Sequence, residues 1–448
     1  MNSRLRVVIV GGNPGGMAAI SQIRKGRPEA EIVVLERGRW TSYSACGVPY
    51  LVGGVVSGGP ERLVARSPEA HRRSGTDVRL HHEATALDLT RREVEVFDGD
   101  SGSTYRLGFD HLHLAMGGRP LRPPLPGIDL PFVYGVQTLD DATELLAAVE
   151  RRDLRQVVVV GSGYIGLEIA EAFVERKAAV VVVEQAAQPM PASLDPEMGA
   201  LVAEAMTRFG IDVRLGVEAV GFEEGVVHTT AGPLPADLVL LGIGVGPRSE
   251  LAESAGLPLG PQGAIRVDDR QATPVAGVWS AGDCCQSTHL VTGQPVHVAL
   301  GTVANKQGRV AGVNIGGGEA RFPGVLGTAI SKICETEVAR TGLNMRQAAE
   351  AGLDACAVSI EATTAAGYWP GTAPLTVRMV VERGAGRVLG AQIVGGAGSA
   401  KRIDTCATAI TARMDVQQVV DLDLAYAPPF SSVWDPVAVA AREALKQI

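Results

Sequence analysis

The sequence contains few cysteines, no excess of positive charge and no long apolar segment. Six cysteines in 448 residues are too few for a scaffold held together by disulfides. A formal net charge of −8 argues against nucleic acid as the main partner. No run approaches the roughly 18 apolar residues of a membrane-spanning helix, and the N-terminal residues lack the pattern of a secretory signal. We therefore expect a cytoplasmic protein of about three domains, at ~150 residues per domain.

The N-terminal segment has the pattern of a dinucleotide-binding unit. An apolar strand over residues 5–10 leads into the turn GGNPGG, then into a helix from Met17 that Gly26 ends, and then into a strand ending in Glu36. Glycines in such a turn let the backbone approach a pyrophosphate at a helix N-terminus, and the acid accepts hydrogen bonds from a ribose. Asn13 replaces the middle glycine of the usual pattern. Support comes from residues 275–285, where a strand delivers Asp283 to a sugar hydroxyl or a phosphate.

The same pattern returns at residues 156–184. Gly161, Gly163 and Gly166 complete G-x-G-x-x-G between two valine-rich strands, and Glu184 ends the second strand. An acid at that position accepts from a ribose 2′-hydroxyl and repels a 2′-phosphate, which favours NADH over NADPH. Two complete units predict that the chain binds two dinucleotides.

The arrangement predicts an α/β fold with two Rossmann-like domains and a C-terminal α+β domain. Two Gly/Pro-rich segments, 114–127 and 242–257, are expected to carry the chain out of the first unit and back. Residues 375–396 alternate like strands, and residues 399–422 are expected to be helical. The predicted domains are a first nucleotide-binding domain split between 1–115 and 250–323, a second at 116–249, and a C-terminal domain at 324–448.

Cys46 stands alone in the stretch TSYSACGVPYLVGG. The next cysteine towards the C-terminus is Cys284, which leaves Cys46 no local partner for a disulfide or a metal site. A lone thiol after a nucleotide unit, at a turn into a helix, indicates redox chemistry, and the alternative is a small buried cysteine. The adjacent Cys284 and Cys285 could form a second redox pair or a disulfide, but a disulfide between adjacent residues would be strained, which counts against it. We interpret Cys334, Cys356 and Cys406 as core residues and predict no metal site.

Together these motifs resemble the flavin-dependent pyridine nucleotide–disulfide oxidoreductases from end to end. The resemblance implies FAD in the first unit, NADH (or NADPH) in the second, and a homodimer formed by the C-terminal domain. The expected flavin contacts are Gly11, Gly15, Gly16, Glu36, Arg37, Ser42, Gly118 and Asp283. The expected pyridine nucleotide contacts are Gly161, Gly163, Ile165, Gly166, Glu168 and Glu184.

Within that family, SYSACGVPY resembles the single-cysteine branch of coenzyme A disulfide reductases, NADH oxidases, NADH peroxidases and persulfide reductases. No second cysteine follows Cys46 at the spacing of the two-cysteine branch, and no histidine follows His297 to serve as its acid–base group. Pro14 stands where the peroxidases and many of the oxidases have a histidine. These departures count against the dithiol branch and against histidine-assisted peroxide chemistry.

Two tyrosine-bearing stretches resemble motifs of the coenzyme A disulfide reductases. GYWPGTAPLTVRM holds Tyr368 and YAPPFSSVWDPV holds Tyr426, and the resemblance implies that both tyrosines act at the active site of the partner subunit. The expected coenzyme A contacts are Gln22, Lys25 and Ser42. Ala45 replaces the asparagine that often precedes the cysteine. Arg24, Lys25 and Arg27 could neutralise the phosphates of coenzyme A, or form a solvated face.

The resemblance implies a reductase that passes electrons from the pyridine nucleotide through flavin to a disulfide or persulfide, coenzyme A disulfide being the best guess. Cys46 would cycle through a mixed disulfide with coenzyme A, and Tyr426, with Tyr368, would donate a proton to the leaving thiolate. Two alternatives stay open. One is an NADH oxidase in which Cys46 cycles through a sulfenic acid. The other is a flavoprotein redox sensor or electron-transfer protein.

Overall fold

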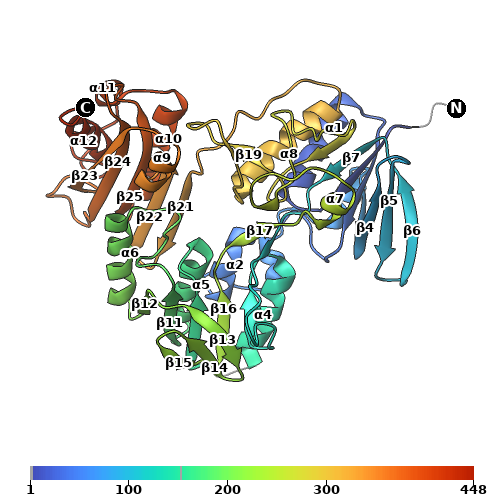
Figure 1. The fold of residues 1–448 in the computed structure, drawn as a ribbon, viewed down its shortest axis with the longest axis horizontal. Coiled ribbons are helices and arrows are strands. Elements are labelled where there is room, and N and C mark those ends of the chain that lie inside the picture. Colours follow the sequence, from blue (N-terminus) through green and yellow to red (C-terminus); the bar gives the residue numbers. More distant parts are fainter. Residues whose placement is uncertain (1–3, 152–153) are drawn as a thin grey trace.

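The computed structural model describes residues 4–151 and 154–448, which form two α/β units and a C-terminal unit (Figure 1). The first unit is built on a parallel five-stranded sheet of order β18-β7-β1-β2-β3. Its strands are β1 (Arg6–Val10), β2 (Glu31–Glu36), β3 (Asp77–Leu80), β7 (His111–Leu114) and β18 (Val278–Ser280). Because β18 follows the second unit in sequence, the chain leaves this sheet and later returns to it.

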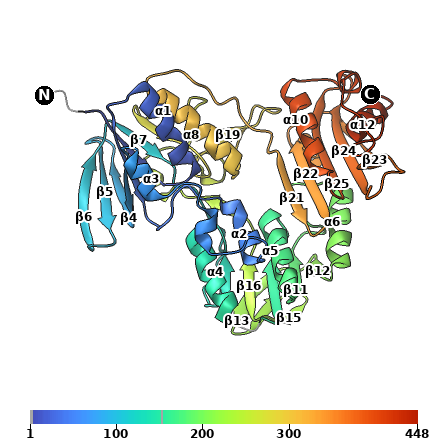
Figure 2. The ribbon, with the colours of Figure 1, turned by 180° about the vertical axis from the view of Figure 1, so that it is seen from behind.

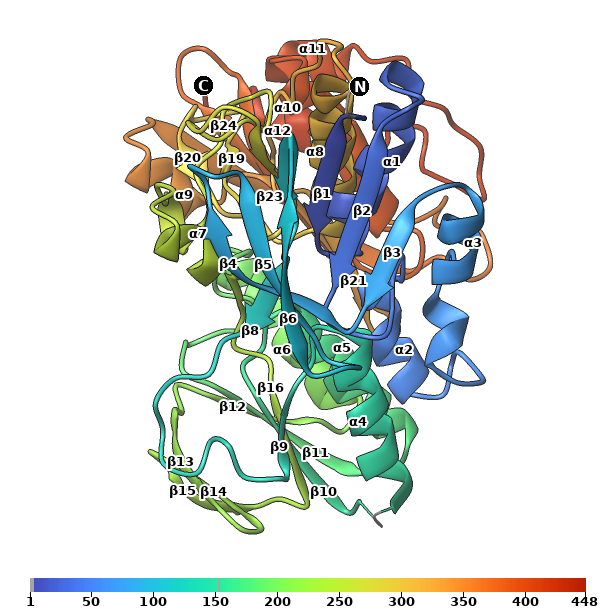
Figure 3. The same ribbon diagram turned by 90° about the vertical axis from the view of Figure 1, so that its right-hand side faces the viewer.

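Layers on both faces bury the first sheet. Helices α1 (Pro14–Gly26) and α8 (Gly301–Ile315) pack together on one face, and a three-stranded sheet covers the other (Figure 3). That small sheet consists of β4 (His82–Asp88), β5 (Glu93–Asp98) and β6 (Ser103–Gly108). The prediction that the first helix starts at Met17 is wrong, since α1 begins at Pro14. Proline suits the first helical position because its missing N–H would have no partner there.

The second unit repeats this plan with a parallel sheet of order β12-β11-β10-β16-β9. The strands are β9 (Val133–Gly135), β10 (Gln156–Val160), β11 (Ala179–Glu184), β12 (Asp212–Leu215) and β16 (Leu238–Leu241). Helices α4 (Leu139–Arg151) and α5 (Tyr164–Glu175) cover one face. The hairpin sheet of β13 (Ala219–Glu223), β14 (Val226–Thr229) and β15 (Gly232–Pro235) covers the other. Valine fills the centre of this sheet, as expected for parallel strands buried on both faces.

The two connections between the nucleotide units run side by side. Strand β8 (Gly118–Pro120) leads out of the first unit, and β17 (Val245–Pro247) leads back, and the two pair antiparallel. Both strands lie in the Gly/Pro-rich segments that the sequence marks as crossings. The exact domain boundaries stay predictions.

The C-terminal unit is an antiparallel sheet of order β21-β22-β25-β24-β23 with helices packed on it. Its strands are β21 (Ala329–Ile333), β22 (Thr336–Gly342), β23 (Ala355–Thr363), β24 (Pro374–Glu382) and β25 (Val388–Gly395). The expected helix over 399–422 is instead two helices, α10 (Ile403–Thr411) and α11 (Val416–Val420). Arg413 has a left-handed φ of +56°, which ends the first helix, and Asp415 caps the second.

The remaining elements are short, apart from α6, and lie between or against the sheets described above. They are α2 (Val48–Val52), α3 (Pro68–Arg73), α6 (Pro196–Arg208), α7 (Glu250–Ser254), α9 (Met345–Glu350), α12 (Pro436–Ala444), β19 (Ser287–Thr288) and β20 (Pro295–Val296). Among the described residues, no helix combines the length and apolar character needed to cross a bilayer.

A buried ion pair fastens the second unit to the C-terminal unit. Asp195, at the start of α6, is 3% exposed and accepts hydrogen bonds from Arg378 Nε at 2.8 Å and Gln392 Nε2 at 2.9 Å. Its other carboxylate oxygen accepts from the backbone N–H of Met345 at 3.0 Å. This contact fixes the second nucleotide unit relative to the C-terminal sheet.

Candidate active site

The first glycine turn leaves no room for side chains where β1 meets α1. Gly11 has a left-handed φ of +110° and donates its N–H to Leu35 O. A Cβ at Gly16 would lie 2.1 Å from Gly11 O, and one at Gly15 would lie 2.8 Å from Ala281 O. The glycines therefore leave the N-terminal end of α1 without side chains, which fits a close approach of the FAD pyrophosphate to the backbone.

Two carboxylates lie on either side of this turn. The Glu36 carboxylate accepts hydrogen bonds from the backbone N–H groups of Gly12 and Gly38, each at 2.8 Å. Burial raises the pKa of Glu36 and also that of Asp283. Gly118 lies against the Asp283 side chain, while Arg37 is exposed beside Glu36. That these residues contact the flavin stays a prediction that the geometry supports.

The second glycine turn has the same construction. Gly161 has a φ of +95°, and a Cβ at Gly166 would lie 2.2 Å from Gly161 O. Gly163 is the N-cap of α5, and Ile165 lies in the first helical turn. This turn fits the pyrophosphate of a pyridine nucleotide.

Glu184 closes the second turn at the end of β11. Its carboxylate is buried and accepts from the Ser162 hydroxyl at 2.6 Å, the Ser162 N–H at 3.0 Å and the Ala186 N–H at 2.9 Å. These three hydrogen bonds fix the carboxylate beside the glycine turn. A carboxylate at this position favours a ribose hydroxyl and disfavours a phosphate at the same place.

Cys46 lies at the junction of the two nucleotide units. It occupies a short 3₁₀ turn (Ala45–Gly47) directly before α2, and its thiol is exposed. Helix α2 leaves the first unit and packs against α4 and α5 of the second (Figure 2). The loop before Cys46 is tied to the first glycine turn, since Asn13 Oδ1 accepts from the Tyr43 N–H at 3.2 Å. Asn13, which departs from the usual pattern, thus has a structural partner in this loop.

Charges from both predicted nucleotide sites act on the Cys46 thiol. Partial desolvation raises the pKa of Cys46, and the carboxylates of Glu168 and Asp283 raise it further. Cys46, Glu168 and Asp283, which the sequence predicts as site residues, therefore lie close enough to interact electrostatically. The start of a helix is expected to lower the pKa of a thiol beside it. In the protein alone, the five-residue helix α2 does not outweigh desolvation and two negative charges.

Glu168 links the two halves of the site to the C-terminal unit. It lies on α5, and its Oε1 accepts a hydrogen bond from the Ser331 hydroxyl on β21 at 2.9 Å. Burial raises the pKa of Glu168 to about 6, with the Ser331 hydrogen bond opposing the rise and Glu171 adding to it. Sequence reasoning missed Ser331, because no local pattern connects residues that lie 163 positions apart.

The charge of Glu168 should make the reactivity of Cys46 depend on pH. Above about pH 6, Glu168 is ionised and disfavours the Cys46 thiolate, whereas below about pH 6 it is neutral. We expect Glu168→Gln to speed alkylation of Cys46 by iodoacetamide about threefold to tenfold at pH 7.5. The rates of variant and wild type should converge below pH 6. Equal rates at pH 7.5 would contradict the electrostatic contact, and Glu175→Gln, at the exposed end of the same helix, is the matched control.

The expected coenzyme A contacts lie along and beyond α1. Gln22 is half-buried on this helix and Lys25 is exposed, without a salt bridge in the described part of the chain. Arg24 donates to Pro28 O and Ala30 O, and Arg27 Nε donates to Ile315 O at 3.1 Å. Main-chain carbonyls therefore engage Arg24 and the Nε of Arg27, whereas Arg27 and Lys25 both remain exposed.

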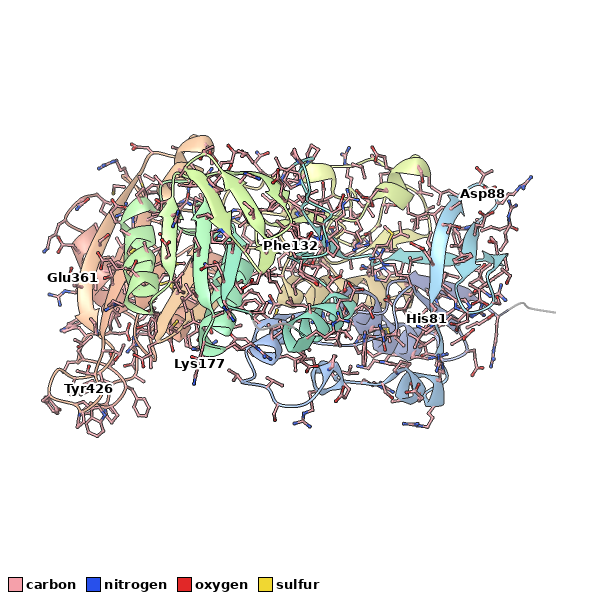
Figure 4. All side chains as sticks on the ribbon, turned by 90° about the horizontal axis from the view of Figure 1, so that it is seen from below. His81, Asp88, Phe132, Lys177, Glu361 and Tyr426 are labelled. Carbon is pink, nitrogen blue, oxygen red and sulfur yellow. The ribbon has the colours of Figure 1, made fainter. Side chains whose placement is uncertain are left out.

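The two predicted catalytic tyrosines lie together but away from Cys46. Tyr368 is 75% exposed and Tyr426 47% exposed, and the phenols contact one another. Tyr426 projects from the C-terminal end of the molecule (Figure 4). Within the described residues, neither tyrosine contacts Cys46. We call their surroundings the aromatic patch, which comprises Tyr368, Trp369, Tyr426, Phe430, Val433 and Trp434, all exposed.

The other cysteines are free and buried, as predicted for Cys334, Cys356 and Cys406. Cys284 is 0% and Cys285 1% exposed, and no disulfide joins them. Burial raises the pKa of both thiols. Across residues 4–151 and 154–448, no cluster of three or more His, Cys, Asp or Glu side chains is placed to hold a metal ion.

Two glycine turns, each followed by an acid, and a thiol where the units meet define an oxidoreductase with two nucleotide sites. The family model described as pyridine nucleotide-disulphide oxidoreductase matches residues 5–308, and the model of its dimerisation domain matches residues 328–438. The chain belongs to this family. It is an NAD(P)H-dependent flavoprotein oxidoreductase. The family that the sequence motifs predict is therefore confirmed.

Individual relatives match over nearly the whole chain. A CoA-dependent NAD(P)H sulfur oxidoreductase of Pyrococcus furiosus is 37% identical over 98% of both chains. An NADH oxidase of Methanocaldococcus jannaschii is 34% identical over 99% of both chains. The solved structure of an NAD-dependent persulfide reductase from A. fulgidus has a TM-score of 0.96 and 38% identity, over 99% of this chain and 83% of that one.

Proposed function

We propose that the protein uses NADH to reduce a sulfur–sulfur bond in a coenzyme A-linked substrate. A coenzyme A persulfide or polysulfide is the first candidate, and coenzyme A disulfide is the second. The observation that carries the proposal is the exposed, unpaired thiol of Cys46 at the start of α2, the helix that joins the two nucleotide units. Relatives at 37–38% identity that are named for sulfur or persulfide reduction support the first candidate.

The thiolate of Cys46 would attack the sulfur attached to coenzyme A. The bond to the outer sulfur breaks, the leaving thiolate or hydrosulfide takes a proton, and a mixed disulfide between Cys46 and coenzyme A forms. FAD, held by Gly11, Gly16 and Asp283, would supply a two-electron connection between the nicotinamide and this disulfide. Arrival of two electrons would release coenzyme A and restore Cys46.

The proton donor would come from a second copy of the chain. The aromatic patch exposes five aromatic side chains and a valine on the C-terminal unit, and apolar surface of this extent marks an interaction site. The dimerisation-domain match over residues 328–438 supports a homodimer. In such a dimer Tyr426, with Tyr368, would face Cys46 of the other subunit, where a phenol can protonate a leaving thiolate. We expect the dimer to work in the cytoplasm.

Glu184 should set the preference for NADH. Because its carboxylate is fixed by Ser162 and Ala186, it would repel the 2′-phosphate of NADPH. We expect Glu184→Gln to raise kcat/KM for NADPH about tenfold and to lower that for NADH about tenfold. Steady-state rates with both nucleotides measure the change. Glu197→Gln removes an exposed acid on α6 in the same unit and is the control. An unchanged ratio of kcat/KM for NADH to that for NADPH in Glu184→Gln would contradict this role.

Anaerobic turnover separates the candidate functions. We expect NADH consumption under nitrogen with coenzyme A persulfide, and more slowly with coenzyme A disulfide, together with release of coenzyme A thiol. If NADH is consumed only when oxygen is admitted, the NADH oxidase alternative is correct, which the Methanocaldococcus jannaschii relative favours. Consumption that requires a protein acceptor would point to an electron-transfer protein.

A further inference from the structure

Ser42 has a backbone conformation that serine rarely adopts. Its φ is +52°, in the left-handed region, where a residue with a Cβ is disfavoured relative to glycine. Strained residues of this kind persist where the surrounding structure fixes them, and they gather at functional sites. Ser42 precedes Cys46 by four positions, so its conformation sets the direction in which the chain enters the active-site turn.

Two backbone hydrogen bonds fix Ser42 from opposite sides. Its N–H donates to Gly12 O at 2.9 Å, in the first glycine turn, and its carbonyl accepts from the Ala65 N–H at 2.8 Å. Glycine could make both bonds without strain. The backbone therefore explains why the chain turns here, but it does not explain why the residue has a hydroxyl.

The hydroxyl has one specific partner, the imidazole of His71. Ser42 Oγ lies 2.9 Å from His71 Nε2, and His71 is 5% exposed on α3. Burial, and then Arg66, lower the pKa of His71. The ring is thus neutral at neutral pH and offers one donor and one acceptor nitrogen. A buried, neutral imidazole holds a hydroxyl in a defined orientation without adding charge beside Cys46.

Packing alone does not hold this loop. An open cavity of about 420 Å³ lies beside it, lined by Trp40, Thr41, Ala65 and Ser67 among others. Helix α3, which carries His71, has only six residues and depends on its Ser67 cap, whose hydroxyl accepts from the Ala70 N–H at 3.2 Å. The Ser42–His71 hydrogen bond is therefore a specific side-chain tie between the Cys46 loop and α3.

We propose that His71 is a positioning residue that orients the Ser42 hydroxyl, and with it the Cys46 loop, to receive the coenzyme A part of the substrate. This rests on the proposed function and on the expectation from the sequence that Ser42 contacts coenzyme A. His71 itself does not contact substrate. It acts through Ser42, and the two residues should behave as one unit.

The ratio of kcat/KM for coenzyme A disulfide to that for a small aromatic disulfide tests the proposal. Losing the partner of a buried hydrogen bond should lower this ratio about tenfold in His71→Leu. His71→Gln, which retains a side-chain amide near Nε2, should recover most of the loss. Ser42→Ala and Ser42→Gly should each match His71→Leu, although glycine relieves the strain. The double variant His71→Leu/Ser42→Ala should be no worse than either single variant.

His228→Leu is the matched control, because His228 lies on β14 in the hairpin sheet of the second unit and pairs with Glu223. An unchanged ratio in His71→Leu, or effects that multiply in the double variant, would overturn the proposal. A second readout needs no substrate: amide hydrogen exchange of residues 41–46 and of Ala65 should accelerate about tenfold in His71→Leu. If wild type does not turn over coenzyme A substrates, the proposed function fails. Hydrogen exchange then still tests whether His71 positions the loop. Unchanged exchange rates of residues 41–46 and Ala65 in His71→Leu would contradict that role.

Discussion

Cys46→Ser should lose turnover of coenzyme A persulfide and coenzyme A disulfide by at least about a thousandfold, while NADH still bleaches the flavin absorbance. A serine hydroxyl does not ionise near neutral pH and cannot form a mixed disulfide, so the exchange step has no nucleophile. The predicted nucleotide sites consist of other residues, namely the two glycine turns and their acids, and should accept NADH as before. Stopped-flow absorbance measures the bleaching, and release of coenzyme A thiol measures turnover.

Cys334→Ala is the matched control for this prediction. Cys334 belongs to the buried cluster that also contains Val48 and Leu51 of α2. It is only 7% exposed and takes no part in the proposed exchange. We expect this variant to keep turnover. Normal turnover in Cys46→Ser would remove the thiol from the mechanism. Loss of bleaching in the same variant would show that Cys46 serves nucleotide or flavin binding instead.

The sequence predicts those parts of the site whose residues lie close together in the chain. Each glycine turn, its helix and its terminal acid lie within about thirty residues, so the local pattern is enough to assign Glu36 and Glu184 to the two turns. Cys46 is also visible locally, because it is the only cysteine before Cys284. The pairing of β8 with β17 agrees with the Gly/Pro-rich crossings that the sequence marks.

Contacts between distant segments could not be predicted. The Ser331 hydroxyl reaches Glu168 only because β21 packs against α5, and His71 meets Ser42 only because α3 folds back beside β3. The engagement of Arg24 by the Pro28 and Ala30 carbonyls likewise depends on how the chain turns after α1. A charge pattern alone does not distinguish such an arginine from one that is free to bind a phosphate.

Gly16→Ala should lose bound flavin, to below about a tenth of the wild-type content. A Cβ at Gly16 would lie 2.1 Å from Gly11 O, and backbone atoms cannot yield as a flexible side chain would. Either α1 or the turn must move, and the N–H groups that face the pyrophosphate move with it. The ratio of flavin to protein absorbance in the purified variant measures the loss. Gly301→Ala is the control, because a Cβ there meets no atom within 4 Å.

The second turn provides the test that separates a local effect from general misfolding. A Cβ at Gly166 would lie 2.2 Å from Gly161 O, so Gly166→Ala has the same clash in the second unit. This variant should retain flavin but lose its bleaching by NADH, whereas Gly16→Ala should lose flavin yet still bind NADH in calorimetry. Loss of both ligands in both variants would mean that the substitutions unfold the chain. Full flavin content in Gly16→Ala would mean that the first turn does not hold FAD, because the clash in that turn would then have no effect on flavin binding.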